Sequence, residues 1–288
     1  MPLVLALLAY TGLTIVAAPL VLTRGHWRMR RPGLALILWH GAFLSGIAAA
    51  IVSMVVAVAL AVGVNGMVPT MRTDAFGPTV IVVSAWLALA IVGGLSALVL
   101  ARAEPLLELD REAEKSFADL LDSGFARSER VGRLTIRFIA SSLPIACTSP
   151  GRRAEVIVST RLQDELSAGE LRAVIEHERA HLRHRHALVK RLALINSACL
   201  PGVLGATEFK RATDLLIELI ADDSAARVCG HHQVSMALAR IAELRSSAGL
   251  VARSDRLLQL SPNHVRATQR RADARPSVSA EGVFYLPC

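Results

Sequence analysis

Charged residues and cysteines are both scarce in this sequence, and their scarcity excludes several classes of protein. Only 19% of the 288 residues are charged and 53% are apolar, whereas about a quarter of a typical soluble domain is charged. A disordered chain and a coiled coil are therefore excluded. The four cysteines lie far apart without a C-x-x-C pair, so neither a disulfide framework nor a cysteine-built zinc site is expected.

The apolar residues gather in three long runs. Residues 3–22, 34–62 and 79–101 contain no charged side chain. Each run reaches the roughly 20 helical residues that are needed to cross about 30 Å of bilayer hydrocarbon. A cleaved signal peptide is the alternative for the first run. Signal peptides begin with basic residues, however, and no basic residue precedes this run. We therefore expect three transmembrane helices within residues 1–101, with the lipid bilayer as their partner.

The arginines of the loops indicate the orientation in the membrane. The loop between the first two runs holds several arginines, whereas the loop between the second and third holds only Arg72, which Asp74 offsets. The positive-inside rule places the first loop in the cytoplasm. The amino terminus is then outside, and the chain after Ala101 is inside. Part of the net charge of +8 thus reflects topology rather than nucleic-acid binding.

Residues 102–252 carry the patterns of a mixed α+β domain. Residues 104–121 have helical apolar spacing and predict an amphipathic helix that continues out of the membrane. The β-branched runs 134–138 and 156–158 predict strands of a small sheet. The expected fold class is therefore a mainly α membrane protein with three N-terminal spans and an α+β domain.

Two further helices are predicted to form a hairpin over about 168–229. Ser167 and Glu170 have the S-x-x-E spacing of a capping box, which starts a helix near residue 168. A Pro-Gly pair at residues 201–202 breaks the helical pattern, and a second helix returns from it. The arginine-rich residues 253–288 are expected to form a basic, partly disordered tail.

The first helix of this hairpin contains an H-E-x-x-H motif. His177 and His181 are four residues apart and share a helix face, so both imidazoles can reach one metal ion. Glu178 lies about 100° further round the helix and can take a proton from a metal-bound water. The alternative is a solvated, histidine-rich face, because His184 and His186 follow at once. The helical context and the capping box favour the metal site.

A catalytic zinc ion needs a third protein ligand and an open fourth position. The longer H-E-x-x-H-x-x-G-x-x-H motif is absent, because His184 and Ala187 stand where its glycine and last histidine would be. The other solution is a carboxylate from the second helix, and Glu218 offers one. An ordinary exposed glutamate is the alternative. However, Glu218 has apolar neighbours on both sides in the sequence, and a buried carboxylate there needs a cation or a metal as partner.

The expected register of the hairpin brings the candidate residues together. With a turn centred near residue 200, Glu218 faces His181 and Asp222 lies beside His177. A carboxylate that accepts the other ring N–H of a ligand histidine fixes its orientation, which is the role expected of Asp222. A single membrane crossing by residues 187–206 would place Glu218 on the opposite side of the bilayer from His181. We therefore expect the hairpin to return.

Two segments of the chain resemble a known family. They read H-E-R-A-H-L-x-x-R-H over residues 177–186 and E-L-I-A-D-D-S-A-A-R over residues 218–227. Together with the three apolar runs before them, they resemble the BlaR/MecR-type antirepressor membrane zinc metallopeptidases, in particular the short actinobacterial form. Antibiotic-sensing members carry a carboxyl-terminal penicillin-binding domain. The chain after Cys229 lacks the S-x-x-K motif of that domain.

The resemblance implies a gluzincin-type zinc endopeptidase in the bacterial plasma membrane, with its active site at the cytoplasmic face. One Zn²⁺ per chain would be held by His177, His181 and Glu218, with Glu178 as general base. The implied partner is a protein substrate, such as a winged-helix transcriptional repressor in a signalling pathway.

The sequence is also compatible with other functions. One is a membrane quality-control metalloprotease of the prenyl-protein or stress type. Another is a non-catalytic membrane sensor or scaffold that retains zinc, although zinc binding alone would not require Glu178. Direct nucleic-acid binding is not expected, because the arginines of residues 266–275 have no aromatic side chains among them for base stacking.

Overall fold

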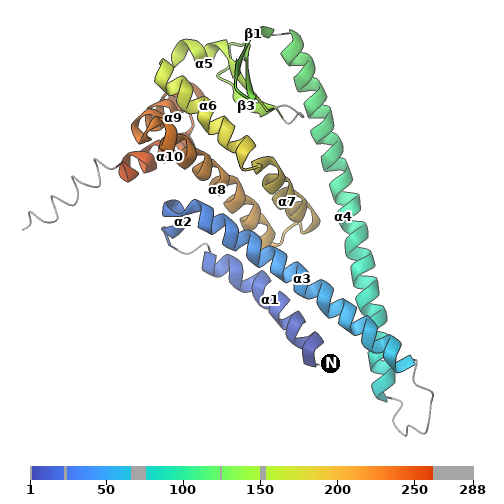
Figure 1. Ribbon diagram of the computed structural model, residues 1–288. Helices are drawn as coiled ribbons and strands as arrows, with labels where there is room; N and C mark the ends of the chain where they lie inside the picture. The colour runs from blue at the N-terminus through green and yellow to red at the C-terminus, as the bar shows by residue number, and fades with distance from the viewer. Residues whose placement is uncertain (1, 23–24, 66–75, 124, 150–153, 262–288) are drawn as a thin grey trace, which may run out of the picture.

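The structure is a computed structural model (Figure 1), and it describes residues 2–22, 25–65, 76–123, 125–149 and 154–261. It is mostly helical, with one small mixed sheet. The elements of the amino-terminal part are α1 (Pro2–Leu22), α2 (Trp27–Arg30), α3 (Pro32–Asn65) and α4 (Phe76–Ser123).

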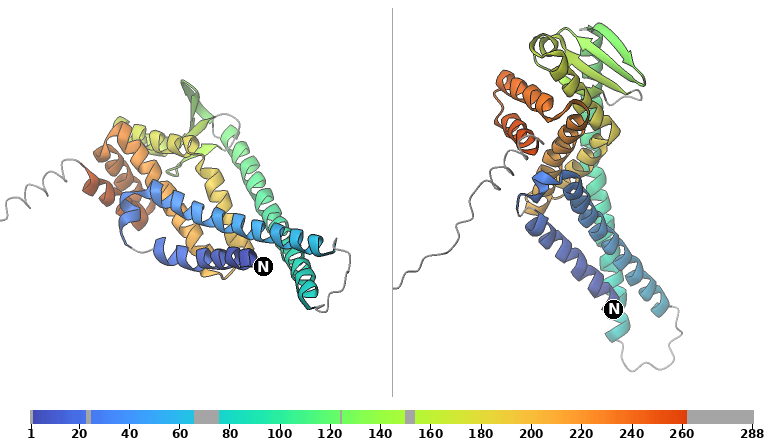
Figure 2. Two further views of the ribbon diagram at one scale, coloured as in Figure 1. Left: turned by 60° about the horizontal axis from the view of Figure 1, so that its bottom comes forward. Right: turned by 60° about the vertical axis from the view of Figure 1, so that its left-hand side comes forward.

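Helices α1 and α3 pack against each other in opposite directions. The Tyr10 hydroxyl donates to Ser45 Oγ at 3.0 Å, and the Ser53 hydroxyl donates to the carbonyl of Val4 at 3.3 Å. Helix α4 contacts α3 and then continues as far as the sheet, so the apolar segment and the amphipathic segment predicted after it form one helix (Figures 1 and 2).

Two of the three predicted spans meet the requirement for crossing a membrane. Stretches of sufficient length and hydropathy lie at Pro32–Ala59 in α3 and at Leu89–Leu106 in α4. In α1 the apolar stretch found among the described residues is the shorter Leu3–Thr14. Many large apolar side chains on these helices are exposed, for example Ile37 at 69% and Trp86 at 70%. Such surfaces are rare on water-soluble monomers and indicate contact with a membrane or a partner.

The sheet follows α4 directly. Its strands are β1 (Phe125–Val131), β2 (Leu134–Ile139), β3 (Ala146–Ser149) and β4 (Glu155–Ser159). They lie in the order β1-β2-β4-β3, with β2 and β4 parallel and the outer pairs antiparallel. The sequence predicted β2 and β4 but neither edge strand, because β1 is largely polar and β3 is short.

The helices after the sheet are α5 (Thr160–Glu165), α6 (Ala168–Arg183), α7 (His186–Cys199), α8 (Leu204–Cys229), α9 (His231–Arg245) and α10 (Ala248–Leu260). Helices α5 and α6 contact the sheet directly, whereas α7 lies against α4 and α8. In the core, Ile136 and Val158 of the sheet belong to one apolar cluster with Val174 of α6 and with apolar side chains of α8 to α10.

The predicted hairpin forms, but its first arm consists of two helices. The capping box starts α6 as expected, since the Ser167 backbone N–H donates to a Glu170 carboxylate oxygen at 2.8 Å. Helix α6 then ends at Arg183, and Arg185 adopts the left-handed conformation at φ +52° before α7 begins. This break turns the side chain of His186 into the protein interior, where it is 2% exposed. A single uninterrupted first helix was therefore the wrong prediction.

The hairpin returns through residues 200–203 and packs against the candidate membrane helix α3. Phe209 of α8 stacks on Phe43 of α3 and also contacts Trp39, with ring centroids 4.9 and 5.9 Å apart. Ala193 of α7 and Leu216 of α8 belong to the same apolar cluster. The site described below is thus connected to α3 by a packed interface.

The first residues of the predicted basic, partly disordered tail belong to a helix. Helix α10 extends through Leu260, and Leu257 is completely buried in the core. In this segment, Arg253 and Arg256 are both paired with carboxylates of α8. The rest of the predicted tail, residues 262–288, lies outside the described residues.

Candidate metal centre

The three side chains that the sequence predicts as metal ligands lie together in the structure. His177 Nε2 and His181 Nε2, on the same face of α6, are 3.1 Å apart. Glu218, from α8, places Oε2 at 3.4 Å from His177 Nε2 and Oε1 at 3.7 Å from His181 Nε2. The antiparallel packing of α8 on α6 brings the carboxylate to the two imidazoles, as the expected register of the hairpin required.

The arrangement fits a zinc ion. Atoms about 2.0–2.2 Å from a tetrahedral zinc lie about 3.3–3.6 Å from one another. The observed separations of 3.1, 3.4 and 3.7 Å fall around that range. Two imidazoles and one carboxylate also form the ligand set of catalytic zinc sites that keep a fourth position open. Among the described residues, this is the only cluster of His, Cys, Asp and Glu close enough to share an ion.

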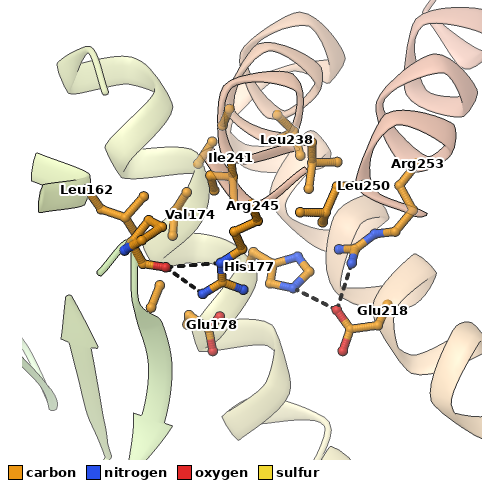
Figure 3. Close-up of a pocket in the computed structure, with 15 residues that line it drawn as sticks. Leu162, Val174, His177, Glu178, Glu218, Leu238, Ile241, Arg245, Leu250 and Arg253 are labelled. Atoms are coloured by element: carbon orange, nitrogen blue, oxygen red, sulfur yellow. Dashed lines mark hydrogen bonds and ion pairs between the residues drawn. The ribbon is translucent and has the colours of Figure 1, made fainter. Parts of the chain in front are cut away.

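Glu178 lies beside this cluster and lines the pocket next to it (Figure 3). Burial raises the pKa of its carboxyl group above the ordinary value, against the opposing effect of His177. A carboxylate with a raised pKa is a better proton acceptor near neutral pH than an exposed glutamate. The position and the environment of Glu178 therefore suit a general base.

Asp222 is completely buried, one helical turn after Glu218. Its Oδ1 lies 3.0 Å from His177 Nδ1, the ring nitrogen opposite the one that faces Glu218. Burial would raise the pKa of Asp222, but Arg253 and His177 hold that pKa below its ordinary value. The ionised carboxylate can therefore accept the Nδ1–H of His177 and fix the direction of the ring.

Arg253 is a site residue that sequence reasoning missed. Its Nε and one terminal nitrogen donate to the two oxygens of Asp222 at 2.8 and 2.7 Å. The other terminal nitrogen donates to Glu218 Oε2 at 3.0 Å (Figure 3). The residue was assigned to a basic, partly disordered tail, although Leu250 and Leu257 flank it at helical spacing. That spacing was the available signal for a packed helix.

His186 is the second residue that was missed. Its Nδ1 lies 2.9 Å from Nδ1 of His181, and burial, together with His184, lowers its pKa to about 4. A neutral His186 can accept the Nδ1–H of His181 when Nε2 of His181 binds a metal. Each of the two candidate ligand histidines thus has its own partner: Asp222 for His177 and His186 for His181.

The two candidate ligand histidines differ strongly in their affinity for protons. Burial alone would lower the pKa of His177, but its contacts with Asp222 and Glu218 outweigh burial and raise that pKa to about 9. Burial and the neighbouring His177 lower the pKa of His181 to about 3. Without a metal, one proton is therefore held at His177, and a metal ion must displace it.

An apolar pocket lies between α6 and the helices α9 and α10 (Figure 3). Arg245, at the end of α9, lines this pocket and donates to the carbonyl of Pro144, so it joins α9 to the loop before β3. The apolar side chains around the pocket are Leu162, Val174, Val234, Leu238, Ile241 and Leu250.

The part of the chain that holds this centre matches a known family. Residues 146–258, from β3 to α10, match the model of peptidase family M48. Peptidases of this family are metal-dependent, typically on zinc, so the match supports a metallopeptidase domain. It does not extend over α1 to α4 and does not support the BlaR/MecR subgroup in particular. No curated protein and no solved structure matches the chain.

Proposed function

We propose that this protein is a membrane-bound zinc endopeptidase that cleaves a protein substrate at the cytoplasmic face. The observation that carries the proposal is the cluster of His177, His181 and Glu218 with the buried Glu178 beside it. The match of residues 146–258 to peptidase family M48 supports the same conclusion.

Each residue of the site has its own role in the proposed reaction. A zinc ion held by His177, His181 and Glu218 would supply a Lewis acid that polarises the peptide carbonyl and lowers the pKa of a bound water. Glu178 takes the proton from the attacking water and passes it to the leaving amine. Asp222 and His186 hold the two imidazoles in one orientation, and Arg253 holds Asp222 and Glu218.

The surroundings of the site support a peptide substrate. Among the described residues, β3 pairs with β4 on one side only, and Ala146 of β3 lines the pocket beside Glu178. A strand with an open edge can bind an extended peptide through backbone hydrogen bonds. The apolar lining of the pocket suits a side chain of such a peptide.

We further propose that the substrate is a transcriptional repressor, and this part rests on the resemblance of residues 177–186 and 218–227 to BlaR/MecR-type enzymes. The experiment offers the zinc-loaded protein in detergent both a candidate winged-helix repressor and an unfolded protein. Cleavage of the repressor at defined bonds supports a regulatory protease. Preference for the unfolded protein supports a quality-control protease, and cleavage of neither supports a zinc-retaining sensor.

The cytoplasmic position of the site follows from the positive-inside rule and has its own test. Single cysteines are introduced at Asn65, at the end of α3, or at Ser128, an exposed residue of β1, in a variant without the natural cysteines. An impermeant thiol reagent applied to intact cells should label position 65 only. Labelling of position 128 from outside would contradict the proposed orientation.

A further inference from the structure

Two arginine–carboxylate pairs lie side by side between α10 and α8. Arg253 and Arg256 are one helical turn apart on α10, and they bind Asp222 and Asp223, which are neighbours on α8. Arg256 donates to the two oxygens of Asp223 at 2.8 and 3.0 Å, as Arg253 does to Asp222. The two arginine side chains are only 14% and 10% exposed. Bidentate pairs shielded from water in this way restrict geometry far more than surface ion pairs do.

The remaining donor of each arginine binds a different part of the molecule. Arg253 reaches the candidate ligand Glu218 at 3.0 Å. Arg256 Nε donates to the backbone carbonyl of Met29 at 2.7 Å. Met29 belongs to α2, the short helix between α1 and α3. Helix α10 therefore binds the metal centre and the connection between two amino-terminal helices at the same time.

Helix α2 also rests on the helix that carries Glu218. Trp27 of α2 packs against an apolar cluster that includes Trp39 of α3 and Leu216 of α8. Leu216 is two residues before Glu218. The position of α2 relative to α8 is thus set by one apolar contact and by the hydrogen bond from Arg256.

We propose that Arg256 is a positioning residue that couples α2 to the metal centre. Arg256 fixes α10 between Asp223 and the carbonyl of Met29, and α10 in turn places Arg253 on Asp222 and Glu218. A displacement of α2 relative to α8 shifts Arg256 and, through α10, Arg253. The hydrogen bond from Arg253 to Glu218 then changes, and with it the position of the Glu218 carboxylate. This inference rests on the proposed function only in treating Glu218 as a metal ligand.

The guanidinium group of Arg256 is needed for this coupling, because it makes three hydrogen bonds in two directions. A lysine is a single point charge on a flexible stem and cannot hold both Asp223 and the Met29 carbonyl in the same way. Arg256→Lys keeps a positive charge beside Asp223 and therefore limits the destabilisation expected when this partly buried carboxylate loses its partner. It is the main test variant, and Arg256→Gln is the second.

The first measurement is the zinc affinity by chelator competition, together with kcat, KM and the thermal stability of the detergent-solubilised protein. Residues that orient metal ligands typically contribute about 10–100-fold, so we expect about 3–10-fold weaker zinc binding in Arg256→Lys and a similar loss of kcat, with KM little changed. Arg240→Gln is the matched control, because Arg240 pairs with Glu243 and Glu165 at the surface, away from the candidate metal ligands. Zinc affinity and kcat in Arg256→Lys equal to those of the control would overturn the proposal.

The second measurement is a double-mutant cycle with Arg253→Lys. If Arg256 acts through Arg253, then Arg256→Lys should change the zinc affinity by less than about twofold once Arg253 is already replaced. If the double variant weakens zinc binding by the product of the two separate factors, Arg253 and Arg256 act independently, and the coupling is contradicted. Wild-type protein that binds no zinc would instead contradict the proposed function, so the two failures are distinguishable.

Discussion

The two sides of the metal centre are specified in different ways. The α6 side consists of His177, Glu178 and His181, which lie within five consecutive residues and share their geometry through one helix. The opposite side is assembled from α8 and α10, with Glu218 and Arg253 separated by 35 residues along the chain. The α6 side is formed by one short segment of the chain, whereas the opposite side forms only because α6, α8 and α10 pack together.

This difference shows where local rules are sufficient and where they are not. Helical periodicity alone places two imidazoles on one face. The position of a carboxylate from another helix depends on the turn at residues 200–203 and on packing along α6, and the position of Arg253 depends in addition on α9. Variants on the α6 side should therefore act directly on the chemistry, and variants on the other side should act through geometry.

The largest effects are expected on the local side. His177→Ala and His181→Ala should each lose stoichiometric zinc and all peptidase activity, because an imidazole ligand is removed. Glu178→Gln should retain zinc and lose at least about 10²-fold in kcat, because the proton acceptor is gone. Metal analysis and peptidase assays on the purified variants measure both. A Glu178→Gln protein that lacked zinc, or that remained active, would refute the division of roles.

The next largest effects are expected on the assembled side. Glu218→Gln should weaken zinc binding severely, because it replaces a charged ligand, whereas Asp222→Asn should weaken it by about 10–100-fold and leave measurable activity. Zinc titration of the two variants gives the ranking. If Asp222→Asn weakened zinc binding more than Glu218→Gln did, then Asp222 rather than Glu218 would be the ligand, and the description of the assembled side would be wrong.

The elements that the sequence predicted correctly are those with strong periodic or capping patterns. The α6 start at Ser167, the strands β2 and β4, and the returning helix α8 all carry such patterns. The edge strand β1 was missed, because its residues are mostly polar and its pairing with β2 is not visible in a single segment. The break at Arg185 was also missed, because no glycine or proline marks it.

The site shows the same limit. Glu218 and Asp222 were predicted by combining the zinc chemistry with a hairpin register, and both lie beside His177 in the structure. Arg253 was assigned to a basic, partly disordered tail, because its partners lie on another helix and a single segment does not show them. His186 was noticed only as part of a histidine-rich segment, since burial of a side chain at a helix break depends on the tertiary structure.

The pH dependence of zinc binding tests the contact between the two sides. His177 has a pKa of about 9 without metal, caused by Asp222 and Glu218 on the opposite side. Zinc must displace that proton, so its apparent affinity should rise about tenfold per pH unit between pH 7 and 9 and level off above. In Asp222→Asn the rise should end at lower pH. Asp214→Asn is the control, since Asp214 pairs with Lys210 at the half-exposed surface. If the zinc affinity of Asp222→Asn levelled off at the same pH as that of the wild type and of Asp214→Asn, the contact would be contradicted.

The smallest effects are expected from the two histidines that follow the motif. His186→Asn should weaken zinc binding by about 10-fold, because the partner of His181 Nδ1 is altered. His184 is exposed, and His184→Asn should change the affinity by less than about twofold, the scale of an ordinary surface substitution. Chelator competition on both variants makes the comparison. The rings of His184 and His186 are stacked, with centroids 5.5 Å apart. A larger effect of His184→Asn than of His186→Asn would show that this stacking, rather than Nδ1 of His186, supports the site.

The most direct test of the central claim is X-ray absorption at the zinc edge on the purified full-length protein. The expected spectrum contains two imidazoles and oxygen donors at about 2.0–2.2 Å, with one zinc per chain. A sulfur neighbour at about 2.3 Å, or an unchanged spectrum in the His177→Ala variant, would contradict the assignment of His177, His181 and Glu218 as the ligands.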